Sequence, residues 1–76
     1  MKTLGELLHT ARSAKNYSLE DIARITKIEI KHIRALENND YGSLPHSTFT
    51  KGFIRSYAKT VGKNPDELIA IYRRDS

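Results

Sequence analysis

Apolar residues recur at helical spacing in five short segments of the chain, with polar residues between them. The spacing of i, i+3, i+4 and i+7 places the apolar side chains of each segment on one face of a helix. No segment shows the strict alternation of apolar and polar residues that is typical of a half-buried strand. The pattern therefore predicts an all-α fold with helices over residues 3–15, 18–26, 29–38, 47–62 and 64–74.

Polar residues at the predicted helix starts support these boundaries. Thr3 with Glu6, and Ser18 with Asp21, have the spacing of a capping box, in which each side chain accepts a hydrogen bond from the other's backbone. Asn64 stands directly before a proline and two acidic residues, which is the usual order of cap and first turn. Three of the five helices therefore begin at well-defined positions.

The segment 47–62 has more apolar surface than a surface helix needs for packing on its own core. Ile54, Tyr57, Ala58 and Val61 form one face, and we expect Tyr57 to lie in the core with its hydroxyl near the surface. Together with the flanking aromatic residues, the apolar arc covers about half of the helical wheel, whereas a stripe of about 100° is sufficient. The excess indicates a second contact beyond the core.

The aromatic residues in this segment leave two interpretations open. Phe49 and Phe53 fall on one flank of the apolar face, whereas Lys51, Arg55 and Lys59 form a basic stripe on the other. The phenylalanines could pack against the domain's own core. Alternatively they form an exposed ridge framed by cations, which is the composition of a protein-binding hot spot.

Two glycines fall inside predicted helices. A glycine in the middle of a helix costs about 1 kcal/mol relative to alanine. Gly52 lies in the middle of the segment 47–62, so we expect another backbone or side chain to come close to it. Gly5 lies in the first turn of its helix, where we expect the cost to be smaller.

The second and third segments have the spacing of a helix-turn-helix motif. Two short helices are joined by a short turn, with the small Ala23 in the first and the β-branched Ile33 ten positions later. In such a motif the second helix enters the major groove and contacts base edges with its N-terminal residues. The candidate DNA contacts are Ser18, Lys27, Lys31, His32 and Arg34.

The chemistry of this motif is mixed. Glu29 would lie close to the phosphate backbone and repel it. Lys27 occupies a turn position that is often glycine, and no Asn or Gln, the usual adenine readers, occurs in residues 29–37. A solvated helix face explains Lys31 and Arg34 equally well, so DNA binding stays an alternative, and we expect it to be weak.

Composition bounds the other possibilities. The 76 residues form one small domain, covering positions 1–76, with a net charge of +4 that suits nucleic acid, an acidic protein surface or an anionic membrane. There is no cysteine, so neither a disulfide nor a thiolate metal site is available. No apolar run approaches 18 residues, so this stretch contains no transmembrane segment.

Catalysis finds little support in the sequence. The adjacent acidic pairs stand at helix starts, where capping explains them. His9, His32 and His46 show no metal-ligand spacing, and the four glycines form no phosphate-binding cluster. We therefore predict a binding domain that is not an enzyme and has no cofactor and no metal.

Four runs of sequence carry a resemblance to a known family. They are LGELLHTAR at 4–12, SLEDIA at 18–23, ALENNDYGSLP at 35–45 and FTKGFIRSYAK at 49–59. Together they resemble the N-terminal cytoplasmic domain of the RodZ family of bacterial cell-shape proteins, over nearly the whole chain. The resemblance implies a compact five-helix, λ-repressor-like fold.

The resemblance also implies a partner. The RodZ domain binds the bacterial actin homologue MreB through its fourth helix and links the filament to the membrane. The aromatic positions used in the family correspond to Phe49 and Phe53, and Lys51 and Arg55 would then meet acidic groups at the rim. A tyrosine is common at the second aromatic position, and phenylalanine keeps its ring but not its hydroxyl.

Family members continue into a linker, one transmembrane helix and an outer domain. None of these follows the helices predicted here. We therefore interpret the chain as a fragment at the cytoplasmic face of the inner membrane, anchored only through segments outside it. The leading hypothesis is an MreB-binding adaptor, and the alternative is a transcriptional regulator that reads DNA with residues 29–38.

Overall fold

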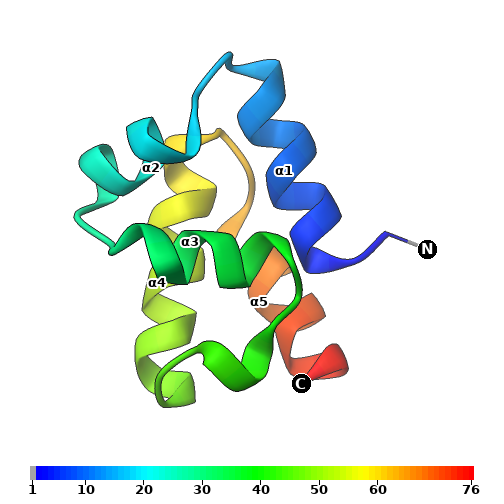
Figure 1. Ribbon diagram of the computed structural model, residues 1–76. Coiled ribbons are helices and arrows are strands. Elements are labelled where there is room, and N and C mark those ends of the chain that lie inside the picture. Colours follow the sequence, from blue (N-terminus) through cyan, green and yellow to red (C-terminus); the bar gives the residue numbers. More distant parts are fainter. Residues whose placement is uncertain (1) are drawn as a thin grey trace.

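Five α-helices and one 3₁₀ turn form the regular structure of residues 2–76, the part of the chain that the computed structural model describes (Figure 1). In chain order they are α1 (Leu4–Ala14), α2 (Leu19–Thr26), α3 (Ile30–Glu37), η1 (Tyr41–Ser43), α4 (Ser47–Thr60) and α5 (Pro65–Asp75). No strand occurs among these residues, so the all-α prediction is confirmed. Each predicted helix is present, with ends no more than two residues from the predicted ones.

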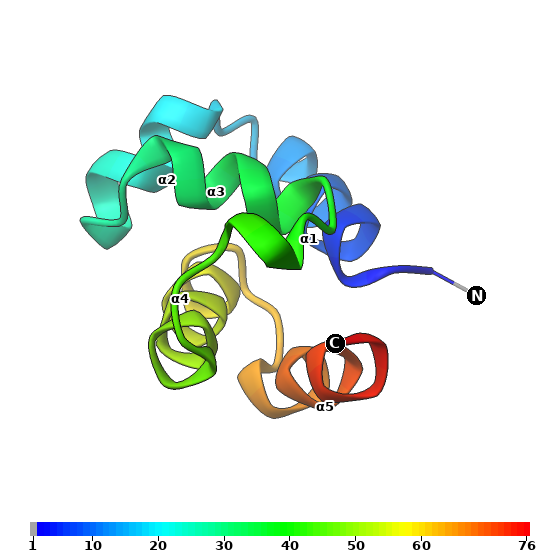
Figure 2. The same ribbon diagram turned by 60° about the horizontal axis from the view of Figure 1, so that its bottom comes forward.

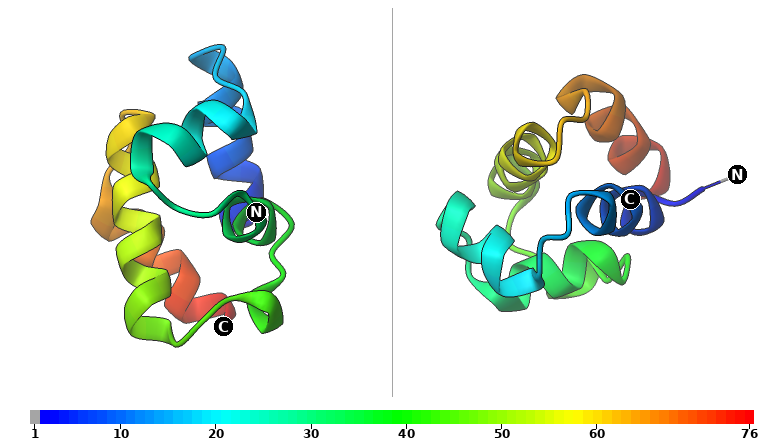
Figure 3. Two further views of the ribbon diagram at one scale, coloured as in Figure 1. Left: turned by 60° about the vertical axis from the view of Figure 1, so that its left-hand side comes forward. Right: turned by 90° about the horizontal axis from the view of Figure 1, so that it is seen from above.

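The helices form two groups that face each other across the core. Figure 2 shows α1, α2 and α3 on one side and α4 with α5 on the other, and the right-hand view of Figure 3 shows the same division. In Figure 1, α3 crosses in front of α4. The core lies between the two groups and consists of Leu4, Leu8, Ala11, Ile22, Ile28, Ile33, Leu36, Ile54, Tyr57, Ala58, Val61, Leu68, Ile69 and Tyr72.

The helix ends follow the polar signals in the sequence. Both predicted capping boxes form: Thr3 Oγ1 accepts from the Glu6 backbone at 3.2 Å, and Ser18 Oγ accepts from the Asp21 backbone at 3.0 Å. At its other end, α2 closes on Lys27 in the left-handed conformation, with a φ of 64°. Glycine adopts this conformation at no steric cost, which is why the turn position is often glycine.

The two helical glycines differ from the expectation from sequence, because Gly5 has a close neighbour and Gly52 has none. A Cβ on Gly5 would lie 2.1 Å from the Glu37 carbonyl oxygen, so α1 and α3 approach each other closely only because this residue has no side chain. The Gly5 backbone N–H donates to Asn39 Oδ1 at 2.9 Å and fixes the same crossing. A Cβ on Gly52 would meet no atom within 4 Å. The expected close neighbour of Gly52 is therefore absent from the described residues.

A buried polar cluster joins the three helices α1, α3 and α4. Arg12 of α1 donates to the two Glu37 oxygens at 2.7 and 3.0 Å, and the Glu37 side chain is only 9% exposed. The hydroxyl of Tyr57 on α4 also donates to Glu37, and Tyr57 is fully buried. The expectation that this hydroxyl lies near the surface is therefore wrong. A buried hydroxyl needs a partner, and the Glu37 carboxylate supplies one.

The same contacts control the protonation of Glu37. Burial alone would raise the pKa of the Glu37 carboxyl, but hydrogen bonds from Arg12, Tyr57 and His9 outweigh it and hold that pKa below its usual value. Burial and the neighbouring Glu37 charge raise the pKa of the Tyr57 hydroxyl. At neutral pH the cluster is therefore an ionised carboxylate between a guanidinium and a neutral phenol, and it locks α4 against α1 and α3.

Candidate functional site

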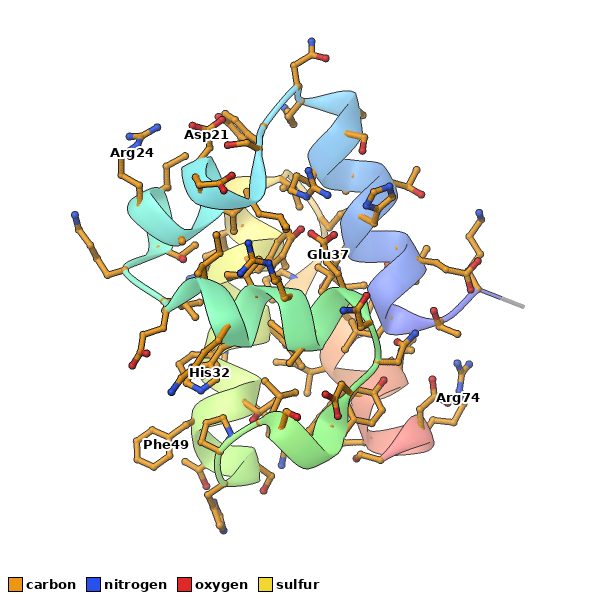
Figure 4. The ribbon with its side chains drawn as sticks, in the orientation of Figure 1. Asp21, Arg24, His32, Glu37, Phe49 and Arg74 are labelled. Carbon is orange, nitrogen blue, oxygen red and sulfur yellow. The ribbon has the colours of Figure 1, made fainter. Side chains whose placement is uncertain are left out.

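The position of α4 decides which of its residues meet solvent. Thr50, Ile54, Tyr57 and Ala58 face the core and are buried. Phe49 lies outside that face and is 63% exposed. Among the described residues it is the more exposed of the two large apolar side chains that meet solvent. Figure 4 shows its ring at the edge of the molecule, pointing away from the core. Phe49 therefore contributes little to the fold and leaves an apolar ring in water.

Phe53 lies one turn further along α4 and has a different environment. Its side chain is half-buried and packs against the edge of the core. Its ring also stacks on the imidazole of His32 on α3, with ring centroids 5.2 Å apart and planes inclined by 24°. The two interpretations of the aromatic pair thus divide between the residues, because Phe49 is exposed and Phe53 is shared between core and surface.

The basic residues of α4 lie on the far flank from the aromatic ones. Two residues along a helix turn about 200°, so Lys51 and Arg55 lie about 160° around the axis from Phe49 and Phe53 respectively. Arg55 is exposed and Lys51 is half-buried. The outward strip between the two flanks contains Gly52, where no side chain projects. The phenylalanines and the cations are therefore the two edges of one shallow outward face of α4.

The structure separates the candidate DNA contacts. Lys27, Lys31 and Arg34 are exposed, and Lys31 lies 3.6 Å from the carboxylate of Glu29. The hydroxyl of Ser18 is engaged in the cap of α2. The set thus divides into cations that face solvent and a capping serine.

His32 stands apart from the other α3 candidates because its ring faces α4 and stacks on Phe53. The contact joins two helices, so the wheel of either helix alone does not display it. One signal was available in the sequence. His32 is four residues before Leu36, which is buried in the core, so both belong to the same side of α3.

Two other kinds of site are absent from the described residues. No group of three or more His, Cys, Asp or Glu side chains in residues 2–76 is arranged to hold a metal ion. The helices of this part of the chain are all too short or too polar to cross a lipid bilayer.

Known proteins match this chain over most of its length. A family model described as a helix-turn-helix domain matches residues 7–68. The chain is 35% identical over 71 residues to the cytoskeleton protein RodZ of Streptococcus pneumoniae, covering 93% of this chain and 26% of that protein. It is 34% identical over 58 residues to the uncharacterized membrane protein YmfM of Bacillus subtilis, covering 76% of this chain and 20% of that protein. The chain thus spans about a quarter or less of these relatives.

A solved structure agrees with the fold. YmfM from Staphylococcus aureus matches with a TM-score of 0.88 and 32% identity, over 97% of this chain and 90% of that one. The sequence resemblance and the helix-turn-helix prediction are both confirmed by these matches. The chain therefore belongs to the helix-turn-helix domain family, and within it to the RodZ-like domains.

Proposed function

We propose that this domain is a cell-shape adaptor, without catalytic activity, that binds filaments of the bacterial actin homologue MreB through the outward face of α4. The observation that carries the proposal is the 63% exposure of Phe49, an apolar ring with little role in the fold. The similarity to a protein named for the cytoskeleton supports a filament as the partner. The similarity to a membrane protein supports anchoring through segments outside these 76 residues. We propose that the domain lies at the cytoplasmic face of the inner membrane.

The outward face of α4 suits a weak and repeated contact. Fully burying a phenylalanine side chain contributes about 1.5–3 kcal/mol, which is too little for tight binding by one ring. A filament presents the same site many times, so anchored copies of the domain gain affinity from multivalency. A modest anchor such as Phe49 is therefore sufficient, and a single domain can still exchange.

The rest of that face shapes the contact around Phe49. At Gly52 no side chain projects into solvent, so a partner's backbone can come close to the helix. Arg55 and Lys51 stand at the opposite edge and form no ion pair within residues 2–76. We therefore expect the partner to offer an apolar socket for Phe49, with acidic groups at one rim.

Phe49→Ala tests the proposal because the ring lies outside the core. We expect the variant to lose most of its co-sedimentation with MreB filaments while its thermal midpoint changes by less than about 3 °C, as for other surface changes. Ile25→Ala is the matched control, since Ile25 is the other exposed large apolar residue, at 41%, and lies on α2. Filament binding that persists in Phe49→Ala would exclude this face.

DNA binding is the second candidate function. It is favoured by the description of the Staphylococcus aureus YmfM as a candidate DNA-binding membrane protein and by the exposed cations Lys27, Lys31 and Arg34. Glu29 offsets part of that charge, because its carboxylate lies 3.6 Å from the Lys31 ammonium. Such a surface suits weak binding to phosphate without base specificity.

A further inference from the structure

We infer that the docking surface extends from α4 onto α3, and that His32 is part of it. This inference rests on the proposed function and names a second helix in the same site. The surface consists of three rings, those of Phe49, Phe53 and His32, which we call the three-ring patch. Figure 4 shows His32 and Phe49 on the same side of the molecule in that view, although they come from different helices.

The stack with His32 fixes the ring in the middle of the patch. Phe53 is held by the core on one side and by the imidazole of His32 on the other, at 5.2 Å between centroids. A half-buried ring with only one neighbour would have more freedom to rotate, and binding would have to remove that freedom. His32 is therefore a positioning residue for Phe53 as well as a half-buried member of the patch.

The imidazole also has free polar atoms. Neither ring nitrogen of His32 makes a hydrogen bond or ion pair within the part of the chain that the structure describes. A histidine that served the fold would normally use at least one nitrogen inside it. The stacked ring leaves both nitrogens available to a partner at the edge of the patch.

The charges around the patch define the partner. Lys51 and Arg55 lie at the other edge of the outward face of α4, whereas Arg34, two residues after His32, lies about 160° around α3 from it. The carboxylate of Glu29, the acidic residue at the start of α3, forms an ion pair with the Lys31 ammonium at 3.6 Å. The complementary surface is thus an apolar socket for the rings, with a carboxylate or carbonyl oxygen placed to accept from His32. The filament protein of the proposed function must present that chemistry where α3 crosses α4.

Substitutions at His32 test the inference through MreB co-sedimentation. His32→Ala should weaken binding about three- to tenfold, the loss expected for one aromatic pair. His32→Phe restores the stacked ring but not the hydrogen-bond donor, so it should recover only the part of the loss that comes from the ring. Thermal midpoints of both variants separate a loss of binding from a loss of fold. Lys31→Ala is the matched control, because Lys31 is next to His32 in the sequence but its side chain is exposed to solvent. This variant should bind MreB within about twofold of the parent.

Nuclear magnetic resonance on the unmodified domain gives a second test that needs no variant. Adding MreB should shift or broaden the imidazole signals of His32 and leave those of His9, which lies on α1, unchanged. Unchanged His32 signals, together with wild-type binding by His32→Ala, would overturn the inference. If Phe49→Ala still loses binding in that case, docking on α4 alone stands. If Phe49→Ala also binds normally, the proposed function itself fails.

Discussion

Two glycines show how far a single residue can be interpreted from its own helix. Gly5 and Gly52 both lie inside helices, and sequence position suggested that Gly52 was the close contact. The structure shows the reverse, because the Glu37 carbonyl of α3 occupies the space beside Gly5 and nothing occupies the space beside Gly52. A helical wheel describes neighbours within one helix, whereas this difference arises between helices.

Alanine substitution at the two glycines should therefore have opposite effects on stability. Gly5→Ala places a methyl 2.1 Å from a backbone oxygen, so α1 and α3 must separate, at a cost of about 1–3 kcal/mol or more. Gly52→Ala meets no atom and gains helix propensity, which should stabilise the fold by up to about 1 kcal/mol. Urea denaturation measures both variants, and equal effects would contradict the packing described here.

At the scale of elements, the helices and their caps could be predicted but their mutual contacts could not. Thr3 and Ser18 signal their helix starts through local spacing, and both caps form as expected. The Arg12–Glu37–Tyr57 cluster joins residues from three helices, 20 or more positions apart in sequence. Glu37 follows the buried Leu36 on α3, but nothing in the sequence identified its partners.

The Arg12–Glu37–Tyr57 cluster should make the stability of the domain depend on pH. The pKa of Glu37 is lowered in the folded state, so its stabilisation is present above its unfolded value of about 4.3 and is lost as the pH falls through the folded value. Glu37→Gln leaves Arg12 without its carboxylate and should cost about 3 kcal/mol at pH 7. The difference in the free energy of unfolding between the parent and Glu37→Gln should shrink below about pH 4.3. Denaturation of both proteins from pH 7 to pH 2 measures this difference. A difference that stays constant with pH would mean that the charge of Glu37 contributes nothing to stability.

At the scale of the whole molecule, the two proposed binding surfaces are neighbours, because the three-ring patch includes His32 of α3. The domain measures 28 × 25 × 18 Å, whereas a specific interface covers about 800 Å² on each partner. A duplex on α3 and a filament on the three-ring patch would therefore overlap. Under the two proposals a filament would bind α4 and DNA would bind α3, and the stack of His32 on Phe53 joins these two helices.

The cations of α3 separate the two functions experimentally. Any duplex that the domain retains at low salt should depend on Lys31 and Arg34, so replacing both with alanine should reduce the slope of log K against log salt by about 2. The same double variant should bind MreB filaments within about twofold of the parent, because neither residue belongs to the three-ring patch. If the double variant binds DNA as well as the parent does, the DNA site lies elsewhere on the domain.

A structure of the domain bound to an MreB filament would show whether Phe49 anchors a protein interface. We expect the Phe49 ring, 63% exposed in the free domain, to become buried against the filament, with α4 facing the partner. A complex in which that ring stays in water, or in which the filament lies on another face of the domain, would contradict it.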